Sequence, residues 1–217
     1  MVRLPWLPRK PGTGTFVYRL LLAVDLEQYS RLLPQQQLIA QTDLRRLLDD
    51  CARRTGLGPD GWYRQVGGDG ELVVLPTDSD VLRAVGPFTR RLEEALADRN
   101  RYRLDTPRLR MRMALHHGPL LIEGPLGPAG DPPIVVARLL DSAPLRRHLA
   151  DHPDRDLALV VSDSLYQDVV RSGFCELDPA AFTALEVETK GRLYRGHIHD
   201  ADAPLASERT MALRTGG

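Results

Sequence analysis

The stretch Val17-Tyr18-Arg19-Leu20-Leu21-Leu22-Ala23-Val24 is a continuous apolar run broken only by Arg19, and Asp25 follows it directly. Apolar runs without polar alternation are typical of β-strands that are buried on both faces of a sheet. We therefore predict a central strand here, with a carboxylate at its end.

A helix and a hairpin are predicted next. From Gln35 to Arg54, apolar residues recur at helical spacing, with a proline before the segment and glycines after it. Two short β-rich runs, Trp62 to Val66 and Leu72 to Leu75, then flank Gly67-Gly68-Asp69-Gly70, which is a hairpin signal. The tight turn of this hairpin should present Asp69.

The following segments are expected to be a helix and a half-buried strand. Residues 80–99 have amphipathic helical spacing, and Pro87 within them should kink the helix or mark its true start. Leu109 to Leu115 alternates apolar residues with Arg110 and Arg112, which predicts a strand with one polar face. The simplest interpretation of these arginines is a solvated face, and a dimer surface is the alternative.

The remaining segments continue the alternation of helices and strands. They are a helix from Ile134 to Leu149 with Asp131 as its cap, a strand from Leu157 to Val161, a helix from Ser162 or Asp163 to Val170, and strands around Leu185 to Val187 and Arg192 to Ile198. Interleaved helices and strands favour an α+β sandwich, in which one mixed sheet carries helices on its faces.

The chain is expected to hold one folded domain with short tails. Its 217 residues suffice for one ordinary domain with a sizeable core. Residues 1–15 are rich in proline and glycine and predict a flexible N-terminal arm. Residues 16–199 carry all the predicted elements, and residues 200–217 predict a polar C-terminal tail.

The composition argues against several classes of partner. The 29 Lys and Arg residues balance 29 Asp and Glu residues, so the bulk charge gives no reason to expect nucleic acid or an anionic membrane as a partner. The apolar run near the N-terminus is far too short to span a bilayer. Cys51 and Cys175 provide neither a disulfide framework nor a set of metal ligands. We therefore expect a cytoplasmic protein without structural zinc.

Asp25 and Asp69 are the candidates for chemistry. If the hairpin pairs beside the first strand, the two carboxylates converge, and their repulsion is usually relieved by proton sharing or by a divalent cation such as Mg²⁺. Such a cation keeps positions open for phosphate oxygens, so the pair predicts a nucleotide-polyphosphate site. Two ordinary roles stay open, since Asp25 would also serve as a helix N-cap and Asp69 as a turn residue beside glycine.

Five segments of the chain carry a family resemblance. They are Ala23-Val24-Asp25-Leu26-Glu27-Gln28-Tyr29-Ser30, Val66-Gly67-Gly68-Asp69-Gly70, Arg112-Met113-Ala114-Leu115-His116-His117-Gly118, Gly130-Asp131 through Ala137-Arg138-Leu139, and Leu159-Val160-Val161-Ser162. Their order and local context resemble class III adenylate/guanylate cyclase homology domains over about residues 16–198. The resemblance implies a ferredoxin-like nucleotide cyclase sandwich with a mixed, mostly antiparallel sheet.

The resemblance also implies a two-metal mechanism. Two Mg²⁺ or Mn²⁺ ions would be held by Asp25, Asp69 and the backbone carbonyl of Leu26. These ions would activate a ribose 3′-hydroxyl and neutralise the triphosphate. The hairpin glycines, which are Gly67, Gly68 and Gly70, would then lie against the nucleotide.

In this family the site lies between the two chains of a head-to-tail homodimer. Arg138 matches the arginine that would stabilise charge on the α-phosphate. Lys190, followed by Gly191, resembles the lysine that holds the triphosphate. We therefore expect a homodimer, or a heterodimer with a related chain, and a purine nucleoside triphosphate as ligand.

Three positions depart from the family pattern. Ile134 takes the place of the ribose-orienting asparagine and has no hydrogen-bonding group. Gln65 replaces a purine-reading lysine, and Gly127 replaces the Asp or Thr that reads the base edge. We therefore predict an incomplete catalytic site in a pseudoenzyme, a signalling module that binds nucleotide and metal or a partner. An active cyclase that makes cAMP or cGMP is the alternative, and a pure interaction surface is a third interpretation.

Overall fold

The apolar run at residues 17–24 lies in strand β1 (Phe16–Leu26), and its residues from Leu20 to Val24 are all buried. The computed structural model describes residues 16–103, 105–122 and 127–200, in which β1 lies inside a seven-stranded sheet. The prediction of a strand buried on both faces is confirmed. The predicted arm at 1–15 and residues 201–217 of the predicted tail lie outside the described residues.

The sheet is mixed and mostly antiparallel, as predicted. The other strands are β2 (Tyr63–Val66), β3 (Gly70–Val74), β4 (Met111–Leu121), β5 (Leu157–Ser162), β6 (Phe182–Thr189) and β7 (Arg192–His199). Their order across the sheet is β2-β3-β1-β4-β5-β7-β6. Neighbouring strands run antiparallel except β4 and β5, which are parallel. The hairpin predicted around Asp69 is β2–β3, and it pairs with β1 through β3.

The helical elements alternate with the strands along the chain. They are η1 (Tyr29–Arg31), α1 (Pro34–Thr55), η2 (Pro59–Gly61), α2 (Val81–Arg83), η3 (Ala84–Phe88), α3 (Thr89–Tyr102), α4 (Asp131–Leu140), α5 (Ala143–Asp151), α6 (Asp163–Leu165), η4 (Tyr166–Val170) and η5 (Pro179–Ala181). In the described ranges, none of the helices has the length and apolar character needed to cross a membrane.

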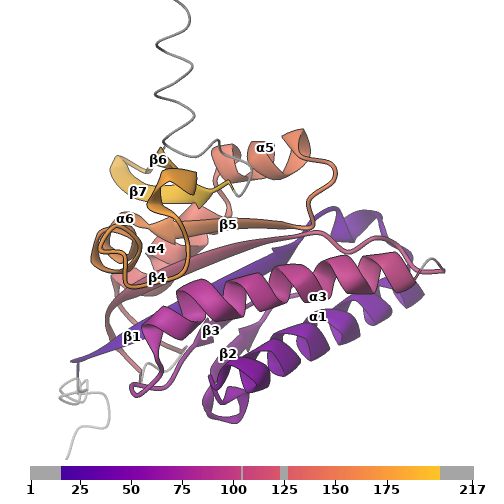
Figure 1. Ribbon diagram of the computed structural model, residues 1–217, viewed down its shortest axis with the longest axis horizontal. Coiled ribbons are helices and arrows are strands. Elements are labelled where there is room, and N and C mark those ends of the chain that lie inside the picture. Colours follow the sequence, from indigo (N-terminus) through magenta and orange to yellow (C-terminus); the bar gives the residue numbers. More distant parts are fainter. Residues whose placement is uncertain (1–15, 104, 123–126, 201–217) are drawn as a thin grey trace, which may run out of the picture.

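Helices cover both faces of the sheet. Helices α1 and α3 lie side by side on one face, while α4 and α5 lie on the other (Figure 1). Successive side chains of a strand point to opposite faces, so β1 contributes to two cores. Leu20, Leu22 and Val24 pack on the α1 and α3 side, whereas Leu21 and Ala23 pack on the α4 and α5 side. The predicted sandwich is confirmed.

Two predicted helices differ in detail from the structure. Helices α2 and α3 are joined through the π-helical turn η3, which contains Pro87, because proline has no N–H to donate and its ring crowds the preceding turn. The predicted helix from residue 134 to 149 is two helices, α4 and α5. Pro144 cannot donate an N–H to continue α4, and Ser142 caps α5 by accepting from the Leu145 N–H.

The prediction that Asp131 caps α4 is wrong. The capping position is Gly130, whose φ of 134° is in the region that favours glycine, and Asp131 is the first helical residue. The Asp131 carboxylate accepts from both terminal nitrogens of Arg192, at 2.8 and 2.9 Å. This ion pair ties the start of α4 to β7.

The prediction that β4 is half buried, with one solvated face, is also wrong. Every residue from Met111 to Leu115 is buried, and Arg112 is only 9% exposed. Arg112 and the neighbouring Arg110 contact acidic side chains, Asp25 and Glu27, at the end of β1. The arginines of this segment therefore lie inside the sheet structure rather than on a solvated face.

Two partly buried histidines should make the stability of the fold depend on pH. Burial lowers the pKa of His116 and of His199 to about 4, from a usual value of 6.5. Because the folded pKa lies below the unfolded one, this stabilisation is complete above pH 6.5 and is lost as the pH falls towards 4. We expect the free energy of unfolding, measured by urea titration, to fall by about 3 kcal/mol for each histidine.

The variant His199→Gln provides the control for this pH dependence. Glutamine does not gain a proton in this range, so the variant should lose less stability than the natural chain between pH 7 and pH 4. An equally steep loss in both proteins would contradict the assignment to His199.

Candidate functional site

The β2–β3 hairpin brings Asp69 beside the end of β1. Asp25 lies opposite Gly70 in the β1–β3 register, and the Leu26 N–H donates to the Asp69 carbonyl at 2.8 Å. Burial raises the pKa of Asp25, and Asp69 is close enough to add to that rise by charge repulsion. The two acids therefore converge, and Asp25 lies on a strand rather than at a helix N-cap.

Gly70 is the hairpin glycine that the geometry requires. A Cβ at Gly70 would lie 1.9 Å from the Val24 carbonyl oxygen, so no side chain fits between β3 and β1 at this point. A Cβ at Gly68 would meet no atom within 4 Å, and one at Gly67 would lie 3.3 Å from the Gly70 carbonyl oxygen. The close approach of the strands depends on Gly70, whereas contact between these glycines and a nucleotide stays a prediction.

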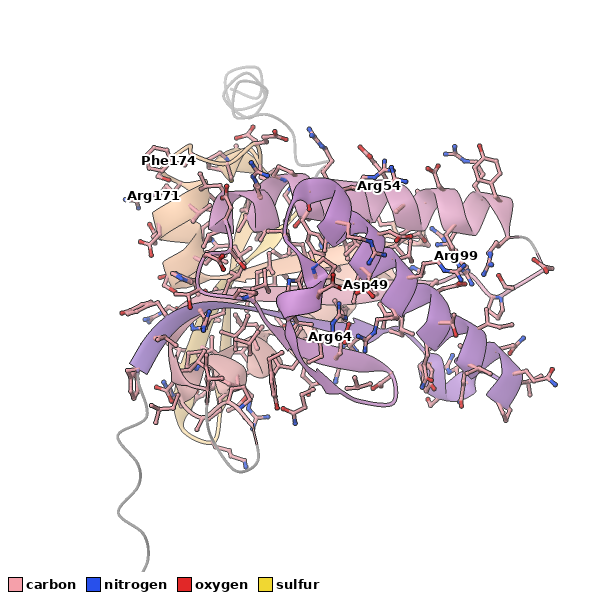
Figure 2. All side chains as sticks on the ribbon, turned by 90° about the horizontal axis from the view of Figure 1, so that it is seen from below. Asp49, Arg54, Arg64, Arg99, Arg171 and Phe174 are labelled. Atoms are coloured by element: carbon pink, nitrogen blue, oxygen red, sulfur yellow. The ribbon has the colours of Figure 1, made fainter. Side chains whose placement is uncertain are left out.

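Side chains of α1 and β2 hold the hairpin in place. Gln41 on α1 donates through Nε2 to the Gly68 carbonyl at 2.8 Å. Arg64 on β2 forms an ion pair with Asp49 of α1, and both side chains lie at the centre of Figure 2. The same guanidinium donates to Glu71 of β3 at 2.6 Å. The hairpin that carries Asp69 is thus fixed to a long helix as well as to β1.

Asp25 has a guanidinium partner that the sequence analysis placed on a solvated face. Arg112 lies directly opposite Asp25 on β4, and its Nη2 contacts Asp25 Oδ2. Beside this pair, Arg110 Nη1 donates to Glu27 Oε2 at 2.7 Å. The charge pattern of the sequence could have predicted both ion pairs. Acids two residues apart at the end of one strand complement arginines two residues apart on an antiparallel neighbour.

The acids of the site fit a divalent cation. Asp25 Oδ1 is buried and has no hydrogen-bond partner among the described residues. A hard cation such as Mg²⁺ or Mn²⁺ would satisfy this oxygen and relieve the repulsion between Asp25 and Asp69. In the described part of the chain, no three His, Cys, Asp or Glu side chains are grouped to hold a metal ion. The other ligands would therefore come from the backbone, from water or from a bound phosphate.

A pocket of about 380 Å³ opens beside the two acids. The end of α4 contributes Ala137, Leu140 and Asp141 to its lining, opposite the hairpin. Glu71 and Asp141 are further carboxylates at this pocket. Asp141 was not a candidate from the sequence. It lies where α4 stops and α5 begins, at the helix break that the hydrophobic spacing did not reveal.

Of the three positions that depart from the family pattern, Gln65 and Gly127 lie at or beside this pocket, whereas Ile134 lies towards the start of α4. Ile134, in the first turn of α4, is 44% exposed, and Arg138 is partly exposed one turn later. Gln65 lines the pocket, and a Cβ at Gly127 would lie 3.7 Å from Gln65 Oε1. The two positions predicted to read the base are therefore neighbours in space.

Lys190 lies at the opposite end of α4 from the acids. It is exposed in the turn between β6 and β7, with a φ of 53°. Arg192, two residues later, pairs with Asp131 at the start of α4, whereas the pocket touches the end of that helix. A single chain therefore does not bring Lys190 to Asp25 and Asp69.

No protein-family model matches the sequence, and no curated protein matches it. Among solved structures, the guanylyl cyclase Cya2 is 16% identical, with a TM-score of 0.61 over 89% of this chain and 97% of that chain. An adenylate/guanylate cyclase/hydrolase from Silicibacter pomeroyi is 21% identical, with a TM-score of 0.61 over 87% of this chain and 99% of that chain. The chain has the nucleotide cyclase fold.

A third similar structure contains a nucleotide. The guanylate cyclase domain of RhGC from Catenaria anguillulae, in complex with GTP, is 18% identical, with a TM-score of 0.54 over 85% of this chain and 97% of that chain. The predicted nucleotide cyclase sandwich is thus confirmed as a fold, and the roles of the individual site residues stay predictions.

Gly70→Ala should disrupt the hairpin, and Gly68→Ala should not. The new Cβ at position 70 overlaps the Val24 carbonyl oxygen and forces β3 away from β1. We expect this variant to lose at least about 2 kcal/mol of unfolding free energy in urea titrations followed by circular dichroism. The control at position 68 meets open space and should change stability by less than about 0.5 kcal/mol. Equal stabilities of the two variants would show that the close approach is not required.

Proposed function

We propose that this chain is a regulatory module of the nucleotide cyclase fold that binds a purine nucleoside triphosphate with Mg²⁺ or Mn²⁺ and has an incomplete catalytic site. One observation carries the proposal: Asp25 and Asp69 share a pocket, whereas Ile134 places an apolar side chain in the first turn of α4. The GTP complex of a similar structure supports a nucleotide as the ligand.

The metal half of the site has its own residues in place. Asp25, Asp69 and the backbone carbonyl of Leu26 would hold the cation. When bound, the cation would neutralise the triphosphate and favour ionisation of the ribose 3′-hydroxyl. Arg112 balances part of the carboxylate charge, so the pair of acids does not have to be neutralised by metal alone.

The other half of the site belongs, in this proposal, to a second chain. Lys190 lies far from the acids of its own chain, so it would reach the triphosphate held by a second copy or by a related protein. Arg138 would stabilise charge on the α-phosphate from the same side. A homodimer or a heterodimer with a related chain follows from this division of the residues.

Ile134 is the reason to propose weak or absent catalysis. Its side chain neither donates nor accepts a hydrogen bond, so it cannot orient a ribose hydroxyl. The loss of one positioning contact costs on the order of a hundred- to a thousand-fold in rate. Gln65 both donates and accepts, and a glycine at 127 offers no side chain, so ATP and GTP should be poorly distinguished.

An active purine nucleotide cyclase is the second candidate function. Asp25, Asp69 and Arg138 are all present, and these are the residues that the chemistry would use most directly. The two candidates differ in product formation, whereas the third interpretation, a pure interaction surface, differs from both in nucleotide binding.

The binding part of the proposal is tested by calorimetry with ATP and GTP in the presence of Mn²⁺. We expect binding of both nucleotides, and at least a tenfold loss of affinity in Asp69→Asn because a cation ligand is removed. Asp78→Asn, which changes an exposed acid outside the pocket, should bind like the natural chain. Absence of binding by the natural chain would leave the interaction surface as the better interpretation.

The catalytic part is tested by restoring the missing amide. Ile134→Asn changes a side chain that is 44% exposed, so the fold should tolerate it. We expect the variant to form cyclic nucleotide from ATP or GTP with Mn²⁺ about a hundred-fold faster than the natural chain. Chromatographic separation of the nucleotides measures the product. If the natural chain already forms cyclic nucleotide at ordinary enzyme rates, this is an active cyclase and the proposal of an incomplete site fails.

A further inference from the structure

The break between α4 and α5 places an ion pair at the edge of the pocket. Asp141, the residue after α4, lines the pocket that contains Asp25 and Asp69. Arg146 on α5 forms an ion pair with Asp141. The Arg146 side chain is 54% exposed and the Asp141 side chain is 61% exposed. The ion pair therefore lies on an accessible edge rather than in the core.

Arg146 is also within electrostatic range of Asp25. Burial raises the pKa of Asp25, and Arg146 is one of the charges that oppose the rise. The pocket is lined by four carboxylates, which are Asp25, Asp69, Glu71 and Asp141. Glu71 is paired with Arg45 and Arg64, whereas Arg112 contacts Asp25 and Arg146 contacts Asp141. Divalent cations held by the acids would make the charge of this region more positive and would attract phosphate groups.

The two arginines differ in their freedom to bind a ligand. The Arg112 side chain is 10% exposed and is held against Asp25 from the neighbouring strand. Arg146 is exposed, and an exposed ion pair such as Arg146–Asp141 contributes little free energy, because water screens it. A guanidinium group binds phosphate through paired, charge-assisted hydrogen bonds, which makes phosphate a strong competitor for Arg146.

We propose that Arg146 binds a phosphate group of the triphosphate held at Asp25 and Asp69, and that Asp141 is the counter-ion from which the phosphate displaces it. The inference rests on the proposed function, because it takes the triphosphate site as given. It adds a residue of the same chain that recognises the phosphate chain, in a segment outside the five that carry the family resemblance. It also predicts that nucleotide polyphosphates bind in preference to monophosphates.

Opposite changes at the two partners distinguish this role from a structural ion pair. Arg146→Ala removes the phosphate contact and should weaken ATP binding about tenfold. Asp141→Asn removes the competing carboxylate and should strengthen ATP binding several-fold. If the Arg146–Asp141 ion pair only stabilised the break between α4 and α5, each variant would remove that stabilisation. Neither variant would then bind ATP more tightly than the natural chain.

The experiment measures dissociation constants for ATP and AMP with the full chain and Mn²⁺. Arg147→Ala is the matched control, since Arg147 is the next residue of α5 and is also exposed. We expect this control to bind both nucleotides like the natural chain, and Arg146→Ala to bind AMP unchanged. Arg146→Gln serves as a second variant if the alanine variant melts at a lower temperature than the natural chain.

The outcomes separate failure of the inference from failure of the proposed function. If the natural chain does not bind ATP, both are overturned. If it binds ATP and Arg146→Ala binds equally well, the inference alone is overturned. A loss of ATP affinity in Asp141→Asn would make Asp141 a metal or nucleotide ligand, which also overturns its role as a counter-ion.

Discussion

Asp25 and Arg112 face each other across β1 and β4, the two longest strands of the sheet. The ion pair between them determines how Asp25 can bind a ligand. Both side chains are mostly buried, so the removal of one partner would leave the other charge without compensation in a poorly solvated place. One carboxylate oxygen is committed to Arg112, and the other has no partner among the described residues. Anything that binds Asp25 must share it with an arginine that the sheet holds in place.

The second acid is positioned by backbone contacts rather than by its own side chain. The Leu26 N–H holds the carbonyl of Asp69, and Gly70 lets β3 approach β1 without a side chain between them. Gln41 ties the hairpin to α1 and donates as well to the hydroxyl of Tyr29 in η1. These contacts fix the backbone of Asp69 while its side chain stays exposed, which is the arrangement that a preorganised site requires.

Much of the fold could be predicted from local patterns in the sequence. The apolar run before Asp25 predicted a strand, the glycine-rich turn at Asp69 predicted a hairpin, and the pairing of these elements brought the acids together as expected. The partners of Arg110 and Arg112 were not predicted, because the alternation of apolar and charged residues does not by itself identify what a polar face contacts. The break at Ser142 was not predicted either, since apolar spacing continues through α4 and α5, although a serine two residues before Pro144 is a helix-start signal. The proximity of Gln65 and Gly127 depends on tertiary structure, which no local pattern encodes.

The place of β1 in the sheet has a consequence for synthesis of the chain. Strand β1 precedes the other described strands in the sequence, yet its neighbours in the sheet are β3 and β4, and β4 begins only at Met111. At translation rates of about 5–20 residues per second, the apolar residues from Leu20 to Val24 remain without their second partner for several seconds. During that interval the nascent chain exposes an uncharged β-forming segment with at least one edge unpaired, which is the kind of segment that chaperones must protect from aggregation.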